Sequence, residues 1–230
     1  MKKFFEKHEL LITISLIIIY IITNSFIINN YGITSYQSVI INAILTLLLV
    51  FLTFKIKKIK DFGLRTFPNP KDYLYFIPLL LMISVNLWNG ININNKTIEI
   101  IYHIISMLFI GFIEEIIFRG YLFKMMEKDN LKSAIIVSSI TFGVGHIINL
   151  FNGADIIPTL LQIMYAITGG YLFVIIFYKS KSLWPCIITH SLINALSIFN
   201  IENNMQYISA IFLTVVALLY AYYINKKIKS

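Results

Sequence analysis

The sequence predicts an all-α, polytopic integral membrane protein of about eight transmembrane helices, built as a single membrane domain over residues 1–230. Hydrophobic residues make up 58% of the chain and charged residues only 13%, about half the charged fraction of a typical soluble domain. Apolar runs recur along the whole chain and are separated by short polar segments. Most of these runs are long enough to cross a hydrocarbon core of about 30 Å.

The eight apolar runs define the elements that we expect. Two of them are short, Tyr73–Trp88 and Leu183–Phe199, and Pro78 within the first of these predicts a kink. In chain order the expected spans are Leu10–Ile28, Tyr36–Phe54, Tyr73–Trp88, Ile98–Phe123, Ala134–Phe151, Ile156–Tyr178, Leu183–Phe199 and Met205–Ile224.

The basic residues indicate how these spans are oriented. With eight spans, nearly all of the 19 basic residues fall on one side; Lys96 alone lies on the other, and Arg119 lies within a span. By the positive-inside rule both termini are cytoplasmic and the chain is a multi-pass protein of the cell membrane. The net charge of +8 therefore reflects topology, so we expect the lipid bilayer as a partner and no nucleic acid.

The fourth span contains three ionisable side chains, Glu114, Glu115 and Arg119. Each costs about 2.5–3.5 kcal/mol at the centre of a membrane helix, so their presence indicates a function. Glu115 and Arg119 are four residues apart in the order that favours a helical ion pair. The alternative interpretation of this pair is a purely structural role. Glu114 points about 100° away from Glu115 on a helix and is free to face another neighbour.

Further polar residues lie at a similar depth in other spans. At 1.5 Å per residue, Glu114 lies about 14 Å from the cytoplasmic end of its span, His146 about 18 Å, His190 about 10 Å and Asn194 about 16 Å. Because residues from three spans share one layer, we expect them to form one site. His103 lies nearer the outer side, and we interpret it as structural or cavity-lining.

Small residues favour close contact beside this layer. Gly143 and Gly145 precede His146 in the sequence. Glycines in membrane helices let a neighbouring helix approach closely. We therefore expect a second span to pack against this part of the fifth span.

The residue types in this layer suit hydrolysis of an amide by an activated water. A carboxylate in low-dielectric surroundings can serve as a general base, and histidine and asparagine can donate hydrogen bonds to a developing oxyanion. Cys186 has no activating setting for a nucleophile. We expect no cofactor, with one alternative left open, in which Glu114, His146 and His190 bind zinc.

The same residues form three motifs: Glu-Glu-x-x-x-Arg at 114–119, Phe-x-x-x-His at 142–146 and His-x-x-x-Asn at 190–194. In this order, on separate spans, they resemble the motifs of the CPBP family. That family groups type II CAAX prenyl endopeptidases with bacteriocin-processing and immunity proteins. The resemblance covers residues 98–200.

The flanking regions carry no motif. Residues 1–97 hold the first three spans, and residues 201–230 hold the last span and a basic tail. We therefore expect the catalytic core within residues 98–200 of the membrane domain.

The resemblance implies an intramembrane glutamic endopeptidase whose client is a peptide or a membrane-protein segment. In it Glu114 would activate water with the help of His146. His190 and Asn194 would form the oxyanion hole, and Glu115 and Arg119 would support them. The client and the oligomeric state stay open.

Two other classes of function remain as alternatives. Buried glutamate and histidine also occur in proton-coupled transporters, although the chain shows no inverted repeat. A non-catalytic immunity or regulatory membrane protein could use the same fold without chemistry.

Overall fold

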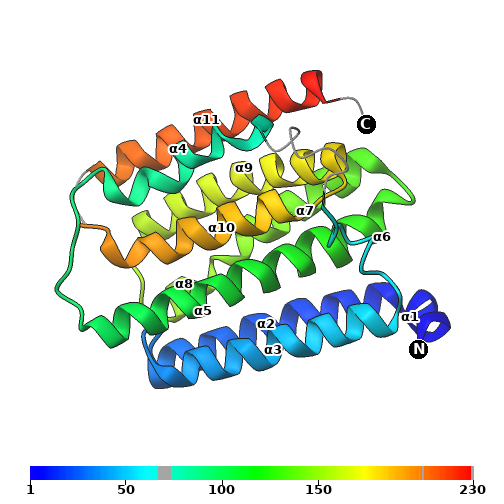
Figure 1. Ribbon diagram of the computed structural model, residues 1–230, viewed down its shortest axis with the longest axis horizontal. Coiled ribbons are helices and arrows are strands. Elements are labelled where there is room, and N and C mark those ends of the chain that lie inside the picture. The colour runs from blue at the N-terminus through cyan, green and yellow to red at the C-terminus, as the bar shows by residue number, and fades with distance from the viewer. Residues whose placement is uncertain (67–73, 202, 204, 229–230) are drawn as a thin grey trace.

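The computed structural model describes residues 1–66, 74–201, 203 and 205–228, and in this part of the chain all regular secondary structure is helical, without strands (Figure 1). Lys71, which is one of the basic residues between the second and third predicted spans, lies outside the described residues, as do Tyr73 at the start of the third predicted span and Glu202 and Lys229 of the C-terminal region. The helices are α1 (Lys2–Lys7), α2 (Glu9–Tyr31), α3 (Tyr36–Lys55), α4 (Leu79–Ile83), η2 (Ser84–Leu87), α5 (Thr97–Glu115), η3 (Ile116–Phe123), α6 (Lys124–Glu127), α7 (Leu131–Gly145), α8 (Ile148–Phe151), α9 (Ile156–Ser180), α10 (Trp184–Leu196), η4 (Ser197–Phe199) and α11 (Met205–Lys227).

Six segments are long and apolar enough to cross a membrane, which makes the chain a multi-pass membrane protein. Two further apolar helical segments are shorter, Leu74–Leu87 and Trp184–Phe199, and they coincide with the two runs that the sequence marks as short. The all-α polytopic architecture is therefore confirmed, whereas the count of eight spans stays a prediction. The six long segments are Glu9–Tyr31, Tyr36–Lys55, Thr97–Glu127, Leu131–Phe151, Ile156–Ser180 and Met205–Lys227.

The third apolar run is not a single kinked helix. Pro78 is the N-cap of α4, which begins at Leu79 and passes directly into the 3₁₀ helix η2. Proline at a helix start is favourable because the first N–H groups have no partner within the helix. The proline therefore marks where the α-helix begins.

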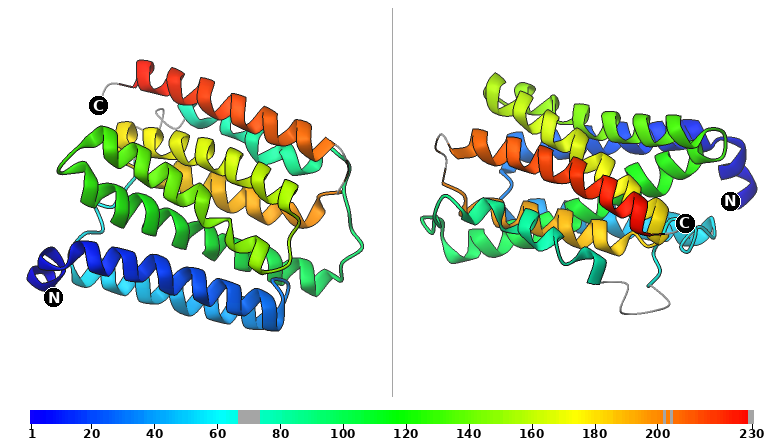
Figure 2. Two further views of the ribbon diagram at one scale, coloured as in Figure 1. Left: turned by 180° about the vertical axis from the view of Figure 1, so that it is seen from behind. Right: turned by 90° about the horizontal axis from the view of Figure 1, so that it is seen from above.

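The helices form a bundle with α9 near its centre (Figure 1). Helix α9 packs against α7 and α11, and α5 packs against α10 and α3. Helices α2 and α3 run side by side along one edge of the bundle, and both termini lie at the same end (Figure 2). Helices α2 and α3 turn apolar side chains outward, among them Leu11, Ile22, Leu47, Leu48 and Phe51, as expected of faces toward lipid tails.

Helices α5, η3 and α6 together form one continuous helix, Thr97–Glu127. Its middle section, η3, is a π-helix in which all eight residues are buried. Ser138 of α7 donates a hydrogen bond of 2.9 Å to the carbonyl of Phe118 within this section. A π-helical segment inside an α-helix often marks a functional site, and this one begins directly after Glu115.

Gly143 lies against α9, as the sequence predicts. A Cβ atom at Gly143 would lie 2.3 Å from Cγ1 of Ile167 and 2.6 Å from its backbone nitrogen, so only glycine allows this contact. Gly145 has nothing within 4 Å of such an atom. The expectation for Gly145 was therefore wrong, because α7 ends at this residue and no neighbouring helix of the described chain packs against it.

Candidate active site

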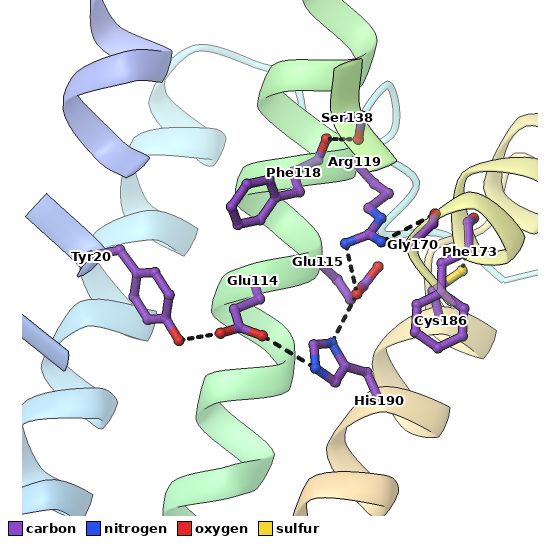
Figure 3. A network of polar contacts seen from close by, with 10 residues as sticks. All are labelled: Tyr20, Glu114, Glu115, Phe118, Arg119, Ser138, Gly170, Phe173, Cys186 and His190. Carbon is purple, nitrogen blue, oxygen red and sulfur yellow. Dashed lines mark hydrogen bonds and ion pairs between the residues drawn. The ribbon is translucent and has the colours of Figure 1, made fainter. Parts of the chain in front are cut away.

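Glu114 of α5 is held by side chains from two other helices (Figure 3). The hydroxyl group of Tyr20, on α2, donates a hydrogen bond of 2.5 Å to Oε1 of Glu114. The other carboxylate oxygen, Oε2, lies 3.2 Å from Nε2 of His190, on α10. The Glu114 carboxylate is buried, and each of its oxygens faces a different helix.

Glu115 contacts two partners as well. Its Oε1 accepts a hydrogen bond of 3.1 Å from Arg119 and lies 2.9 Å from Nδ1 of His190. Glu115 is completely buried. His190 therefore bridges the two neighbouring glutamates, with one ring nitrogen on each, and Glu115 fixes the orientation of the ring in addition to its pairing with Arg119.

The guanidinium group of Arg119 is enclosed by α7 and α9. It donates a hydrogen bond of 3.2 Å to the carbonyl of Gly170 and lies 4.3 Å from the centre of the Phe142 ring. A Cβ atom at Gly170 would be 3.1 Å from Nη2 of Arg119, so the glycine makes room for the cation. Phe173 covers it from a further side, at 5.7 Å.

Close contact between α5 and α10 brings His190 to the glutamates. A Cβ atom at Gly111 would lie 2.3 Å from Oγ of Ser191 and 2.8 Å from its Cα. Ser191 donates a hydrogen bond of 3.2 Å to the carbonyl of Leu108. Gly111 thus lets α10 approach α5 at the residue that follows His190.

His146 lies at the end of α7, as its C-cap residue, and is half-buried. Its ring is edge-on to Phe142 at 5.6 Å, and Phe142 is edge-on to His190 at 5.4 Å. The structure therefore brings His146 to the site, one aromatic ring away from His190.

Asn194 lies one turn beyond His190 on α10 and is half-buried. Among the described residues, its side chain makes no hydrogen bond to the glutamates or to His190. Its backbone carbonyl accepts a hydrogen bond of 3.2 Å from His103. His103, which also lies 3.3 Å from Oγ of Ser197, links α5 to the end of α10 and is structural.

Residues 96–196 match the model of the Rce1-like family, described as type II CAAX prenyl endopeptidases. This segment resembles the Rce1-like family. It contains all of the predicted site residues and is consistent with the CPBP resemblance. No curated protein matches the chain. No solved structure matches it either.

Tyr20, by contrast, lies outside the Rce1-like segment, and the sequence motifs did not identify it. Tyr20 lies ten residues after Leu10, the start of the first predicted span, and therefore about 15 Å from the cytoplasmic end of that span. That is the layer of Glu114, so the depth argument would have found it. Tyrosine is too frequent in this chain, at 14 residues, for one residue to stand out without that argument.

The zinc alternative named Glu114, His146 and His190 as ligands. Among the residues that the structure describes, no three His, Cys, Asp or Glu side chains form a group that could hold a metal ion. Cys186 is buried, and its thiol donates to the carbonyl of Phe173 at 3.3 Å, which fits a packed residue rather than a ligand.

Proposed function

We propose that this chain is an intramembrane endopeptidase in which Glu114 activates the attacking water. The observation that carries the proposal is the buried contact between Glu114 and His190, inside a segment that matches a family of endopeptidases. The client is a peptide or a membrane-protein segment that reaches the site from the cytoplasmic leaflet. The same proposal includes eight spans, with both termini in the cytoplasm.

The buried cluster around Glu114 contains more acidic than basic side chains. Glu114, Glu115 and Arg119 are buried together, and two carboxylates against one guanidinium leave one negative charge. An uncompensated buried charge costs several kcal/mol. His190, whose Nε2 lies 3.2 Å from Oε2 of Glu114, is the polar group beside this charge.

The reaction uses this arrangement as follows. The Glu114 carboxylate removes a proton from water, and the resulting hydroxide forms a bond to the carbonyl carbon of the client. The carbon–nitrogen bond then breaks, and the proton passes from Glu114 to the leaving amine. The water oxygen remains in the new carboxyl group, so no covalent intermediate with the enzyme is required.

The other residues hold the reacting groups. Nε2 of His190 and the amide of Asn194 donate hydrogen bonds to the oxyanion, and His146 orients the water. Glu115 and Arg119 keep the His190 ring in place through its Nδ1 atom. Tyr20 holds Oε1 of Glu114, which leaves Oε2 facing His190.

The test is peptide cleavage by the full chain in proteoliposomes. Two fluorogenic peptides are compared, one ending in a farnesylated CAAX sequence, the substrate class named in the family description, and one without the prenyl group. Glu114→Gln is expected to lower the cleavage rate by about 10²–10⁴-fold, because it removes the general base. His190→Ala is expected to lower the rate as well.

Glu6→Gln is the matched control, since Glu6 is an exposed acid on α1, and we expect it to cleave like wild type. Wild-type activity of a correctly inserted Glu114→Gln protein would refute the proposal. If a strong chelator abolishes cleavage and zinc restores it, the zinc-dependent form of the protease replaces the metal-free one. If wild type cleaves neither peptide, the result favours a non-catalytic immunity or regulatory role over a peptidase.

A further inference from the structure

A second polar site lies at the end of the bundle where four long helices begin or end. A cavity of about 540 Å³ opens there between the start of α2, the segment after α3, the end of α6 and the end of α9. Nine charged side chains line it. Six are basic: Lys58, Lys60, Arg65, Lys124, Lys128 and Lys181.

The cavity has more positive than negative groups. Its three acids each form an ion pair with one lysine: Asp61 with Lys58 at 2.9 Å, Glu127 with Lys124, and Glu9 with Lys128. Among the described residues, Lys60, Arg65 and Lys181 have no carboxylate partner within ion-pair distance. Among the described residues that line the cavity, the basic side chains therefore exceed the acidic ones by three.

Lys181 is the most constrained of these cations. It has a left-handed backbone conformation, with φ of 57°, which is unfavourable for a residue other than glycine. Burial lowers the pKa of its ammonium group below the ordinary value, Glu127 opposes that shift, and the nearby cations Lys124, Arg65 and Lys179 add to it. A bound anion would relieve this crowding of positive charge.

The wall of the cavity is built by specific contacts. The backbone N–H of Leu183 donates to the carbonyl of Gly63 at 2.8 Å, and Oγ of Ser182 donates to the carbonyl of Arg65 at 2.7 Å. Nε of Arg65 donates to the carbonyl of Lys181 at 2.9 Å. A Cβ atom at Gly63 would lie 2.3 Å from the Phe177 ring, so the segment after α3 is fixed against the α9–α10 connection.

We propose that this cavity binds the phosphate group of an anionic phospholipid from the adjacent leaflet. Basic pockets between the ends of membrane helices suit anionic headgroups, and arginine and lysine form strong, charge-assisted hydrogen bonds to phosphate. Phe62, Phe123 and Phe177 supply apolar surface beside the cations, which suits the glycerol and the upper part of the acyl chains. This site is separate from the Glu114 cluster and is independent of the proposed peptidase activity.

The test measures lipid binding by the purified full chain. Native mass spectrometry and thermal unfolding in detergent are followed with added phosphatidylglycerol, phosphatidylcholine or inorganic phosphate. The variant Lys60→Gln/Arg65→Gln/Lys181→Gln is compared with Lys3→Gln/Lys226→Gln/Lys227→Gln, which removes the same charge at positions that do not line the cavity. Because Lys60 is exposed, the single variant Lys60→Gln removes one charge without disturbing the wall of the cavity.

Wild type is expected to retain phosphatidylglycerol and to be stabilised by it more than by phosphatidylcholine. The cavity triple variant should lose about 100-fold in affinity and Lys60→Gln about 5-fold, since each basic group near an anionic headgroup contributes to binding. Equal loss in the control triple variant would overturn the proposal, because the effect would then be general surface charge. Stabilisation by inorganic phosphate equal to that by the lipid would also overturn it, with a free anion as the ligand.

Discussion

Glu114 receives contacts from two helices that are far from it in sequence, and each contact acts on a different oxygen. The Tyr20 hydroxyl group holds Oε1 at 2.5 Å, so it determines how the carboxylate is turned toward His190. Hydrogen bonds to charged groups contribute about 1.5–3 kcal/mol. The position of the proposed base therefore depends on a residue outside the Rce1-like segment.

Tyr20→Phe removes this bond while keeping the ring. For a cleaved peptide, we expect kcat to fall by about 10–100-fold and KM to stay unchanged, because Tyr20 contacts the base and not the client. The measurement is steady-state cleavage in proteoliposomes. Tyr31→Phe, at the exposed end of the same helix, is the control. An unchanged kcat, or a change confined to KM, would remove Tyr20 from the mechanism.

At the scale of elements, the approach of α10 to α5 rests on one small residue. Gly111→Ala would place a methyl group 2.3 Å from Oγ of Ser191 and 2.8 Å from its backbone, and overpacking of this kind typically costs about 1–3 kcal/mol. We expect a lower unfolding temperature in detergent, by several degrees, and loss of peptide cleavage.

Gly169→Ala is the matched control, since the added methyl group meets nothing within 4 Å. Alanine is the better helix former by about 0.5–1 kcal/mol, so this variant should unfold at the same or a higher temperature. Equal unfolding temperatures for Gly111→Ala and Gly169→Ala would show that the contact between α5 and α10 is not tightly packed.

The sequence predicted contacts best where ionisable residues lie four positions apart on one helix or at the same depth on different helices. Glu115 and Arg119, four residues apart, do pair, and the shared depth of Glu114 and His190 does correspond to contact. It could not show that the helix after Glu115 is a π-helix, or that α7 ends at Gly145 and leaves His146 at its tip. Both features are determined by packing against other helices, which no local pattern records.

At the scale of the whole molecule, the number of spans depends on whether the two short helical segments cross the membrane. The termini lie at the same end of the bundle (Figure 1), which an even number of crossings requires. Six long segments and eight in total both satisfy this condition. The two counts differ in the side on which the connections next to the short segments lie.

Single cysteines in a Cys186→Ala background distinguish the two counts. With eight spans, a membrane-impermeant maleimide applied to intact cells should label Asn94→Cys and Asn200→Cys. Lys55→Cys and Lys179→Cys should react only after permeabilisation. The reason is that Leu74–Leu87 lies between Lys55 and Asn94, and Trp184–Phe199 lies between Lys179 and Asn200.

If Lys55→Cys and Asn94→Cys react from the same side, the first short segment does not cross the membrane. The same result for Lys179→Cys and Asn200→Cys would mean that α10, which carries His190, enters and leaves the membrane on one face. The positive-inside argument, which assigns Lys55 and Lys179 to the cytoplasm together with both termini, would then have to be abandoned for that part of the chain.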